Sequence, residues 1–445
     1  MPTQSEPQHP HRHPSLTLPL SLLKMVDENY DLDDDDLSSA SASSPLVAAN
    51  APPTPAPSVD DLKLVDPWDL TKYTCVRVLE PERYSSCVIT FTFLAEGAAN
   101  AVFQILPYAG RIESSFMFVE DGMPVPYSLF LNKVLRVSKG VPKTLSFRDV
   151  VRGFTEDVLP LFAPVSTNGT EVSYKEYLLE DEGVSFDGGL ASHLHTLMHG
   201  EDCAPQDCER IPAMEHRGLL LPDMTSAFGT SLTIEIKPKW LAQSPTAPSK
   251  SFKCRTCALQ ARRASKGKRQ PLSYICPFKL VTGNAEAISD FLRPRILAHF
   301  KVNSANPVVN IDVDIEDILA RATDYLARGP GHGLLKHMQK LQDESDPGGV
   351  CSVPKRLREN SYHCRGVRAA MTLRDCSMFI KVPYRKADGC VESKLADLDF
   401  KSMEKVPDWV SKEEALWNGG WYTNIDTQSV CAVSELWKET CPWWW

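Results

Sequence analysis

The 445-residue sequence predicts an α+β fold in two parts, and three observations support this prediction. Short segments rich in β-branched and aromatic residues follow one another between 87 and 137, as in a sheet. Apolar residues at helical spacing dominate 285–342. Two more strand-like segments, 369–380 and 395–401, come after the helices. We therefore expect a strand-rich N-terminal part and a larger, mixed C-terminal part.

The composition indicates a globular protein of a reducing compartment. Hydrophobic residues make up 42% and aromatic residues 9% of the chain. The thirteen cysteines are odd in number and irregularly spaced, which argues against a disulfide framework. No apolar run is long enough to cross a bilayer, and segment 16–25 is too short and proline-interrupted for a signal peptide. We expect a soluble monomer of the nucleus or cytoplasm with no membrane partner.

The first 65 residues differ from the rest. They combine His and Pro, an acidic block at 27–36, and Ser/Ala/Pro-rich sequence. Such a composition cannot bury enough apolar surface to offset the entropy of ordering. We expect a disordered acidic tail over 1–65, followed by domains over 66–223 and 224–445.

A small-residue turn connects the expected strands of the N-terminal part. The strands are Cys87–Phe93, Ala101–Leu106, Phe116–Val119, Lys133–Val137 and Leu219–Asp223. The turn, Ala95–Asn100, lets backbone N–H groups approach a phosphate, and Arg136 on a nearby strand can reach the same group. This arrangement is similar to the N-terminal lobe of a kinase, although small-residue hairpins without that role share the pattern.

Helices are expected in the C-terminal part at 285–300, 315–327 and 334–342. The segment Gly329-Pro-Gly-His-Gly333 separates the last two, because Gly and Pro interrupt helical patterns. Residues 348–360 are expected to form a basic loop.

A local reversal of charge lies in the middle of the chain. Residues 237–279 hold eleven Lys or Arg and no Asp or Glu, whereas the whole protein has a net charge of −9. At its start, period 2 places Glu235, Lys237 and Lys239 on one face of an expected strand. Such a face can hold phosphates, since a Lys contributes a compact charge and three donors. A solvated charged face is the alternative.

Three carboxylates of the C-terminal part, Asp375, Asp397 and Asp399, have apolar or basic neighbours in sequence. An Asp between buried strands is costly unless it is paired or binds a metal. Phosphoryl transfer needs a carboxylate near the attacking hydroxyl and carboxylates on Mg²⁺. Turn or ion-paired aspartates remain the alternative for each of them.

Eight segments in this order resemble the inositol-pentakisphosphate 2-kinase family, over roughly residues 70 to 415. They are Glu96-Gly-Ala-Ala-Asn100, Val134-Leu-Arg136, Leu221-Pro-Asp223, Glu235-Ile-Lys-Pro-Lys239, Cys254-Arg-Thr-Cys257, Tyr274-Ile-Cys-Pro277, Thr372-Leu-Arg-Asp-Cys-Ser377 and Asp397-Leu-Asp-Phe-Lys401. The fourth and seventh are specific, whereas the first is not. The Leu-Arg-Asp-Cys form and the Pro-rich N-terminus resemble fungal members.

The resemblance implies a two-lobed, kinase-like fold, with an antiparallel N-lobe sheet and helices and a larger C-lobe that holds the inositol phosphate. It implies ATP- and Mg²⁺-dependent phosphorylation of the 2-hydroxyl of inositol 1,3,4,5,6-pentakisphosphate, which gives the hexakisphosphate (phytate). The residues that match the family's nucleotide contacts are Glu96, Gly97, Asn100, Arg136 and Asp223. Ala95 stands where relatives have a first glycine.

The resemblance also assigns the reacting centre. Asp375 matches the catalytic aspartate, with Lys237 beside it, and Asp397 matches the Mg²⁺ ligand, which Asp399 is expected to assist. The residues matching inositol phosphate contacts are Lys237, Lys239, Arg263 (or its neighbour Arg262), Lys401, Lys405 and Trp409. Lys405 and Trp409 depart from the Arg or other polar residue and the Tyr that relatives often have. The family's Asn-Asn pair is not visible; Arg293, Arg295 and His299 stand in that region.

Some members of that family bind zinc through His and Cys, and Cys254 and Cys257 have the spacing of a ligand pair. The pair His363-Cys364 could complete a structural zinc site, although adjacent ligands fit one tetrahedral ion poorly. Buried or idle thiols are the alternative.

Two other functions compete with catalysis. A nucleic-acid-binding protein could use the basic run at 237–279, but the run has only four aromatic residues and no recognised motif, so no nucleic acid partner is expected. A non-catalytic scaffold that binds inositol phosphates is the other alternative; Asp375, Asp397 and Lys237 argue against it, whereas Ala95 and the missing Asn pair keep it open.

Overall fold

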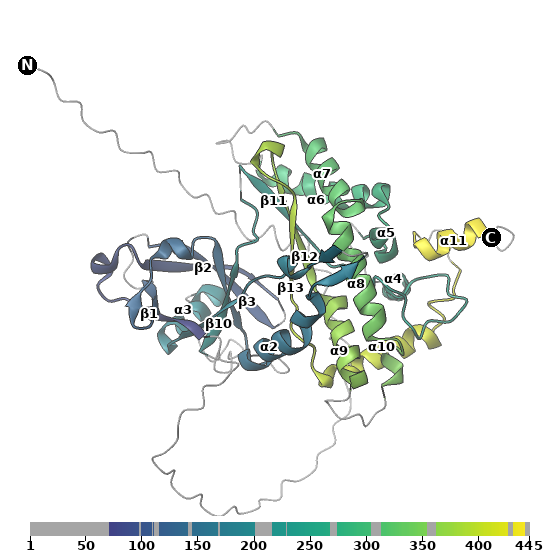
Figure 1. Cartoon of the computed structure of the whole chain (residues 1–445), viewed down its shortest axis with the longest axis horizontal. Helices are drawn as coiled ribbons and strands as arrows, with labels where there is room; N and C mark the ends of the chain where they lie inside the picture. Colours follow the sequence, from purple (N-terminus) through teal and green to yellow (C-terminus); the bar gives the residue numbers. More distant parts are fainter. Residues whose placement is uncertain are drawn as a thin grey trace, which may run out of the picture.

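The computed structural model describes two arrays of strands with helices packed on them (Figure 1). The residues described are 71–97, 99–108, 110, 115–140, 145–167, 170–200, 216–227, 229–267, 274–303, 313–353, 362–425 and 430–440. The tail expected over 1–65 and most of the basic loop expected over 348–360 lie outside them. None of the described helices is long and apolar enough to span a membrane.

The N-terminal part is built on an eight-stranded sheet, ordered β1-β9-β10-β6-β3-β2-β4-β5. β1 pairs with β9 on one side and β4 on the other, so seven of these strands close into a ring. The strands are β1 (Thr71–Arg77), β2 (Val88–Glu96), β3 (Asn100–Pro107), β4 (Phe116–Glu120), β5 (Met123–Pro124), β6 (Lys133–Ser138), β9 (Glu182–Phe186) and β10 (Arg217–Pro222), with β7 (Val165–Thr167) and β8 (Thr170–Val172) forming a separate hairpin.

The expectation of an antiparallel sheet is wrong at one pair, because β1 and β9 run parallel. Parallel neighbours need a long crossover between them, and here more than a hundred residues separate the two strands along the chain. The five strands predicted from sequence are all present, with ends shifted by a few residues.

Alternating burial explains how the ring is filled. On β3, Ala101, Phe103 and Ile105 are buried, and their neighbours are less so. Helix α3 (Gly188–His199) begins at Asp187, whose side chain accepts a hydrogen bond from the backbone N–H of Leu190. Its buried residues join the same apolar core.

The C-terminal part surrounds an antiparallel three-stranded sheet in the order β11-β12-β13. These strands are β11 (Ser231–Ile236), β12 (Ser377–Pro383) and β13 (Glu392–Ala396). The helices of this part are α4 (Arg255–Ser265), α5 (Pro277–Val281), α6 (Ala285–Asn303), α7 (Ile315–Ala327), α8 (Pro330–Ser345), α9 (Tyr362–Asp375), α10 (Val406–Asn418) and α11 (Ala432–Thr440), whereas α2 (Phe147–Gly153) comes earlier in the chain, between β6 and β9. One large core joins the sheet to α5 through α9.

Two predictions for this part are wrong. Residues 369–375 belong to helix α9, because Val367, Ala370 and Leu373 recur at helical spacing and are all fully buried. The segment 329–333 was expected to separate two helices, but most of it belongs to α8. Pro330 begins this helix, at a position where proline is well tolerated. The expected helix at 315–327 is confirmed residue for residue.

The two parts meet where β13 ends. A Cβ on Gly153 of α2 would lie 2.6 Å from Cβ of Phe400, so only glycine permits this approach. Leu178 pairs with Leu395 of β13 in an isolated parallel bridge. Side chains that come from both parts can therefore converge on the segment that follows β13.

Candidate active site

The loop after β11 brings two lysines to one small cavity. β11 ends at Ile236, so the period-2 argument does not extend to Lys239, which instead has a left-handed backbone with φ of 57°. Lys237 and Lys239 nevertheless line the same cavity as Glu235. Arg295 of α6 also lines it, a position that sequence reasoning noted but did not assign. The cavity is thus rich in cations.

Asp375, the last residue of α9, lies between two of the predicted cations. Its carboxylate oxygens are 3.3 Å from Nζ of Lys239 and 2.7 Å from Nζ of Lys401. Burial alone would raise the pKa of Asp375, but the two ammoniums outweigh burial and hold that pKa well below its usual range. The carboxylate is therefore ionised at neutral pH and can accept a hydrogen bond from a hydroxyl.

For the phosphoryl transfer that the family resemblance implies, we expect Lys401→Met to move the acid limb of the pH profile of kcat/KM to higher pH. Without the Lys401 ammonium, the pKa of Asp375 rises toward the ordinary value of about 4, so protonation begins at higher pH. The measurement is kcat/KM of both proteins between about pH 4 and pH 8. Lys401→Arg keeps the charge and is the control. An acid limb that does not move in Lys401→Met would show that Asp375 does not set it.

Ser377 connects two further carboxylates. Its hydroxyl lies 2.6 Å from Oε1 of Glu235 and 3.1 Å from Oδ2 of Asp397. Asp397 has a left-handed backbone with φ of 56°, which is uncommon outside glycine and is typical of functional sites. Carboxylate and hydroxyl oxygens are the ligands that Mg²⁺ takes from proteins, so this group has the donors for a magnesium site.

An ion pair joins the two parts of the molecule at this point. Arg136 on β6 donates to Asp399, and both side chains are largely buried. Burial would raise the pKa of Asp399, but Arg136 outweighs it and holds that pKa below its usual value. Arg136 is thereby brought next to the segment that carries Asp397 and Lys401.

The turn between β2 and β3 is narrower than expected, spanning only the residues from Gly97 to Ala99 between the two strands. The backbone N–H of Gly97 donates to the carbonyl of Asn100 at 2.8 Å. Nζ of Lys139 lies 3.1 Å from Oε2 of Glu96 and 3.1 Å from the carbonyl of Gly97. Sequence reasoning missed Lys139, which places an ammonium at the turn.

The remaining predicted residues lie around this centre. Asp223 follows β10, and its carboxylate accepts from the backbone N–H of Thr225. Arg263 lies in the last turn of α4. Partial burial and the nearby Lys401 lower the pKa of Lys405, just before α10. Trp409 of α10 is buried in an apolar cluster, so its ring has a packing role and substrate contact stays a prediction.

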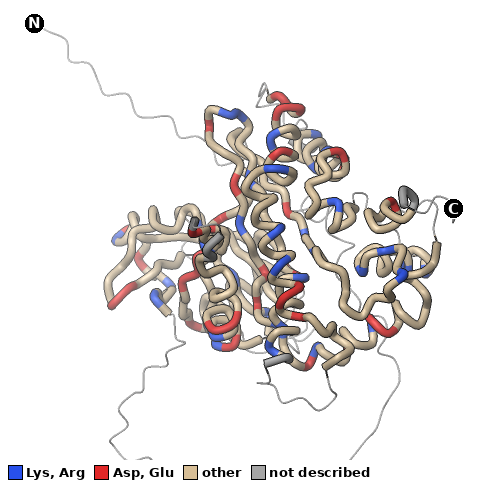
Figure 2. Tube along the Cα trace, turned by 45° about the vertical axis from the view of Figure 1, so that its right-hand side comes forward, with Lys and Arg blue, Asp and Glu red and all other residues tan. Residues whose placement is uncertain are grey.

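The basic run at 237–279 is not one exposed face. Lys253 is buried and donates to a backbone carbonyl, while Arg255 and Lys279 form ion pairs with glutamates. Lys and Arg are interspersed with Asp and Glu along the chain (Figure 2). Only part of the run is thus available to a polyanion.

Four buried cysteines meet at a second place. The sulfur atoms of Cys254, Cys257, Cys276 and Cys431 lie within 4.8 Å of one another. Cys276 is 3.9 Å from both Cys254 and Cys431, close to the roughly 3.8 Å expected between sulfurs of a tetrahedral zinc–thiolate site. Cys364 is not a member of this group, and the side chain of His363 lies outside those that the structure describes, so completion by the pair His363-Cys364 receives no support.

The site combines several carboxylates with nearby lysines, and Arg136 reaches it from a separate sheet. This combination is typical of an enzyme that acts on phosphate groups. A family model described as inositol-pentakisphosphate 2-kinase matches residues 93–415. The inositol-pentakisphosphate 2-kinase of Yarrowia lipolytica (strain CLIB 122 / E 150) is 32% identical over 297 residues, which cover 66% of this chain and 87% of the relative. The chain therefore belongs to the inositol-pentakisphosphate 2-kinase family and is a kinase, as the sequence motifs predicted.

Proposed function

We propose that this kinase transfers the γ-phosphoryl group of ATP to the 2-hydroxyl of inositol 1,3,4,5,6-pentakisphosphate and forms the hexakisphosphate. The observation that carries the proposal is the position of Asp375 between Lys239 and Lys401. A carboxylate that must approach a hydroxyl on a ring of phosphates needs cations on both sides of it, because the phosphates would otherwise repel it.

Cations that line the cavity, with others from nearby segments, then bind the substrate. Each phosphate monoester carries about −1.5 to −2 charges near neutral pH, so five of them carry roughly −7 to −10. Lys237, Lys239, Arg263 and Lys401 come from three separate segments and can surround such an anion. We add Arg295 to this group because it lines the same cavity.

The chemical step follows from the protein's own groups. Asp375 orients the 2-hydroxyl and accepts its proton as the phosphoryl group arrives; a carboxylate of low pKa suffices because the transition state is loose. When phosphates draw Lys239 and Lys401 away, the pKa of Asp375 rises and the carboxylate becomes a better base. Mg²⁺, when bound with ATP, neutralises charge on the transferring group, and Asp397 would hold it, with Asp399 as the assisting carboxylate.

Nucleotide binding is proposed for the other side of the site. Glu96, Gly97 and Asn100 form the turn that would cover the phosphates, and Lys139 adds a cation there. Arg136 would reach the same phosphates, and Asp223 would contact the nucleoside. In this proposal the two parts, with a boundary near residue 223, act as the lobes of a kinase-like fold.

Two further features belong to the proposal. The four-cysteine cluster would hold a structural Zn²⁺, since it supplies four buried thiolate ligands at suitable distances. A cysteine-rich composition without a disulfide framework supports the nucleus or cytoplasm as the location.

The test is incubation of the full chain with ATP, Mg²⁺ and inositol 1,3,4,5,6-pentakisphosphate, followed by anion-exchange chromatography. We expect the hexakisphosphate to appear. A pentakisphosphate isomer that already carries the 2-phosphate is the matched control and should react far more slowly. A folded protein that binds the substrate without turnover would overturn catalysis in favour of a scaffold. A folded protein without either property would overturn the substrate class.

A further inference from the structure

One fully buried amide holds the backbone at the proposed substrate lysine and two residues after it. Gln342 of α8 is 0% exposed. Its Oε1 accepts from the backbone N–H of Leu241 at 2.9 Å, and its Nε2 donates to the carbonyl of Lys239 at 2.9 Å. The same Nε2 lies 3.5 Å from the carbonyl of Leu373, two residues before Asp375. The amide thus contacts both segments of the reacting centre.

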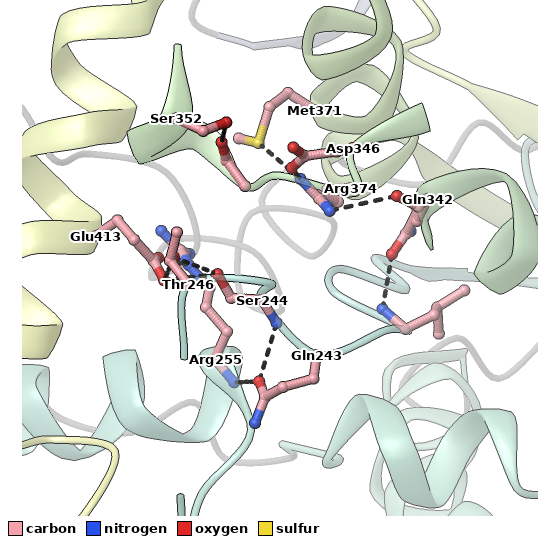
Figure 3. Close-up of polar contacts among 12 residues, drawn as sticks. Gln243, Ser244, Thr246, Arg255, Gln342, Asp346, Ser352, Met371, Arg374 and Glu413 are labelled. Carbon is pink, nitrogen blue, oxygen red and sulfur yellow. Dashed lines mark hydrogen bonds and ion pairs between the residues drawn. The ribbon is translucent and has the colours of Figure 1, made fainter. Parts of the chain in front are cut away.

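A buried ion pair lies next to this amide (Figure 3). Arg374, which precedes Asp375, is 1% exposed and donates to Oδ2 of Asp346 at 2.6 Å. Its second terminal nitrogen donates to the backbone carbonyl of Gln342 at 3.4 Å. The pair therefore ties the end of α9 to the end of α8, where Gln342 already holds the lysine loop.

Trp240 completes the connection from the other side. It follows Lys239 in sequence, is 4% exposed, and lies with its ring centroid 3.7 Å from the guanidinium carbon of Arg374. A second guanidinium, that of Arg255, lies 4.6 Å from the same ring and is paired with the buried Glu413. Stacking of guanidinium on an aromatic ring is favourable and fixes the ring's place.

This arrangement explains how Lys239 keeps an unfavourable backbone. A left-handed φ in a residue with a side chain is unfavourable and persists only where the surroundings over-determine it. Here the carbonyl of Lys239 and the N–H two residues later are both bound by one side chain, and the residue between them is stacked on cations. In this backbone conformation, the Lys239 ammonium lies 3.3 Å from Oδ1 of Asp375.

We propose that Gln342 and Arg374 are positioning residues for the transfer reaction: together they set the distance and orientation between Lys239 and Asp375. Neither lines the cavity that holds the cations, so they act through those two residues. The inference rests on the proposed function, in which Lys239 binds a substrate phosphate and Asp375 contacts the hydroxyl. A displacement of about 1 Å in such a constellation can cost on the order of 100-fold in rate.

The first test is Gln342→Met, which keeps the length of the side chain and removes all of its hydrogen bonds. We expect kcat per folded molecule to fall about 10- to 100-fold and KM for the pentakisphosphate to rise about 5-fold or more, with KM for ATP unchanged. Tyr325→Phe is the matched control, because it removes one buried hydrogen bond, to Ser393, elsewhere in the same core. The melting temperature of the control should fall by a similar amount, whereas its kcat and both KM values should stay unchanged.

The second test separates the geometry from the charge. Arg374→Met leaves Asp346 buried without its partner and is expected to fold poorly, so Arg374→Met is made together with Asp346→Leu to remove the pair as a whole. The double variant should fold and show the same kinetic pattern as Gln342→Met. Arg374→Lys should regain part of kcat, because the ammonium can still pair with Asp346 but cannot also reach the Gln342 carbonyl.

The outcomes distinguish the two proposals. Turnover of the unaltered protein is measured first, together with calorimetric binding of inositol hexakisphosphate as the probe. If the unaltered protein binds the probe but lacks turnover, catalysis fails, and weaker probe binding in Gln342→Met would still support the positioning of Lys239. Folded variants with unchanged kcat, KM and probe binding would overturn this inference alone. An unaltered protein with neither property would overturn both.

Discussion

Asp375→Asn is expected to lower kcat by about 100- to 10,000-fold while the affinity for inositol hexakisphosphate is retained or slightly increased. The amide has the size of the carboxyl group but cannot accept the hydroxyl proton. It also leaves the ammoniums of Lys239 and Lys401 without their present counter-ion, so they remain available to phosphates. Single-turnover kinetics and calorimetry on the same preparation measure the two effects separately.

The matched control for this change is Asp397→Asn. Both residues lie next to β12 or β13 in the same site, but only Asp397 is proposed to hold Mg²⁺. Its substitution should raise the Mg²⁺ concentration needed for half-maximal rate, whereas Asp375→Asn should leave that concentration unchanged. A kcat for Asp375→Asn within tenfold of the unaltered enzyme would remove Asp375 from the catalytic role. Loss of binding in a folded Asp375→Asn protein would do the same.

Local patterns were enough to predict those site residues that lie on or beside strands. Glu235 and Lys237 follow a clear period-2 alternation, and both line the cavity. Asp397 and Lys401 follow β13, as the short apolar segment before them suggested. Their positions could be anticipated because the signal and the structure are both local, within about six residues, whereas their roles in the site stay predictions.

The pattern around Asp375 was misinterpreted for a physical reason. Residues 369–375 contain a short apolar run, and such a run fits a buried strand and a buried helix equally well. The segment is helical because α9 packs closely on the end of α8. At this contact, a Cβ on Gly366 would lie 2.3 Å from the carbonyl oxygen of Ser345. That contact joins distant segments, so no window of sequence contains it.

Residues that act through long-range contacts left no signal in the sequence. Ser377 links a carboxylate on β11 to one that follows β13, and Lys139 reaches the turn before β3. Gln342 lies in an amphipathic helix, where a polar residue is ordinarily solvated. Similarly, Cys276 and Cys431 join Cys254 only because three helices begin at one place. Each depends on the topology of the sheet and helices, which spacing alone did not reveal.

Removal of one cluster cysteine, as in Cys276→Ser, is expected to abolish zinc binding and to lower the free energy of unfolding by more than about 4 kcal/mol. Cys254 and Cys276 occupy the N-cap positions of α4 and α5, and Cys431 directly precedes α11. Thiolates are stabilised at helix N-termini, and a zinc ion bound there would tie the three helices together. Metal content per chain and thermal unfolding are the measurements.

Cys390→Ser is the matched control, because Cys390 is exposed and lies outside the cluster. It should keep one zinc per chain and its melting temperature. The cluster variant should also show a raised KM for the pentakisphosphate, since α4 carries Arg263 in its last turn and would lose its anchored first turn. An unaltered protein that contains no zinc, or a Cys276→Ser protein that keeps both zinc and stability, would contradict a metal role. In that case the buried thiols would stabilise the three helix starts by hydrogen bonding and apolar packing alone, and the site for the inositol phosphate would not depend on a metal.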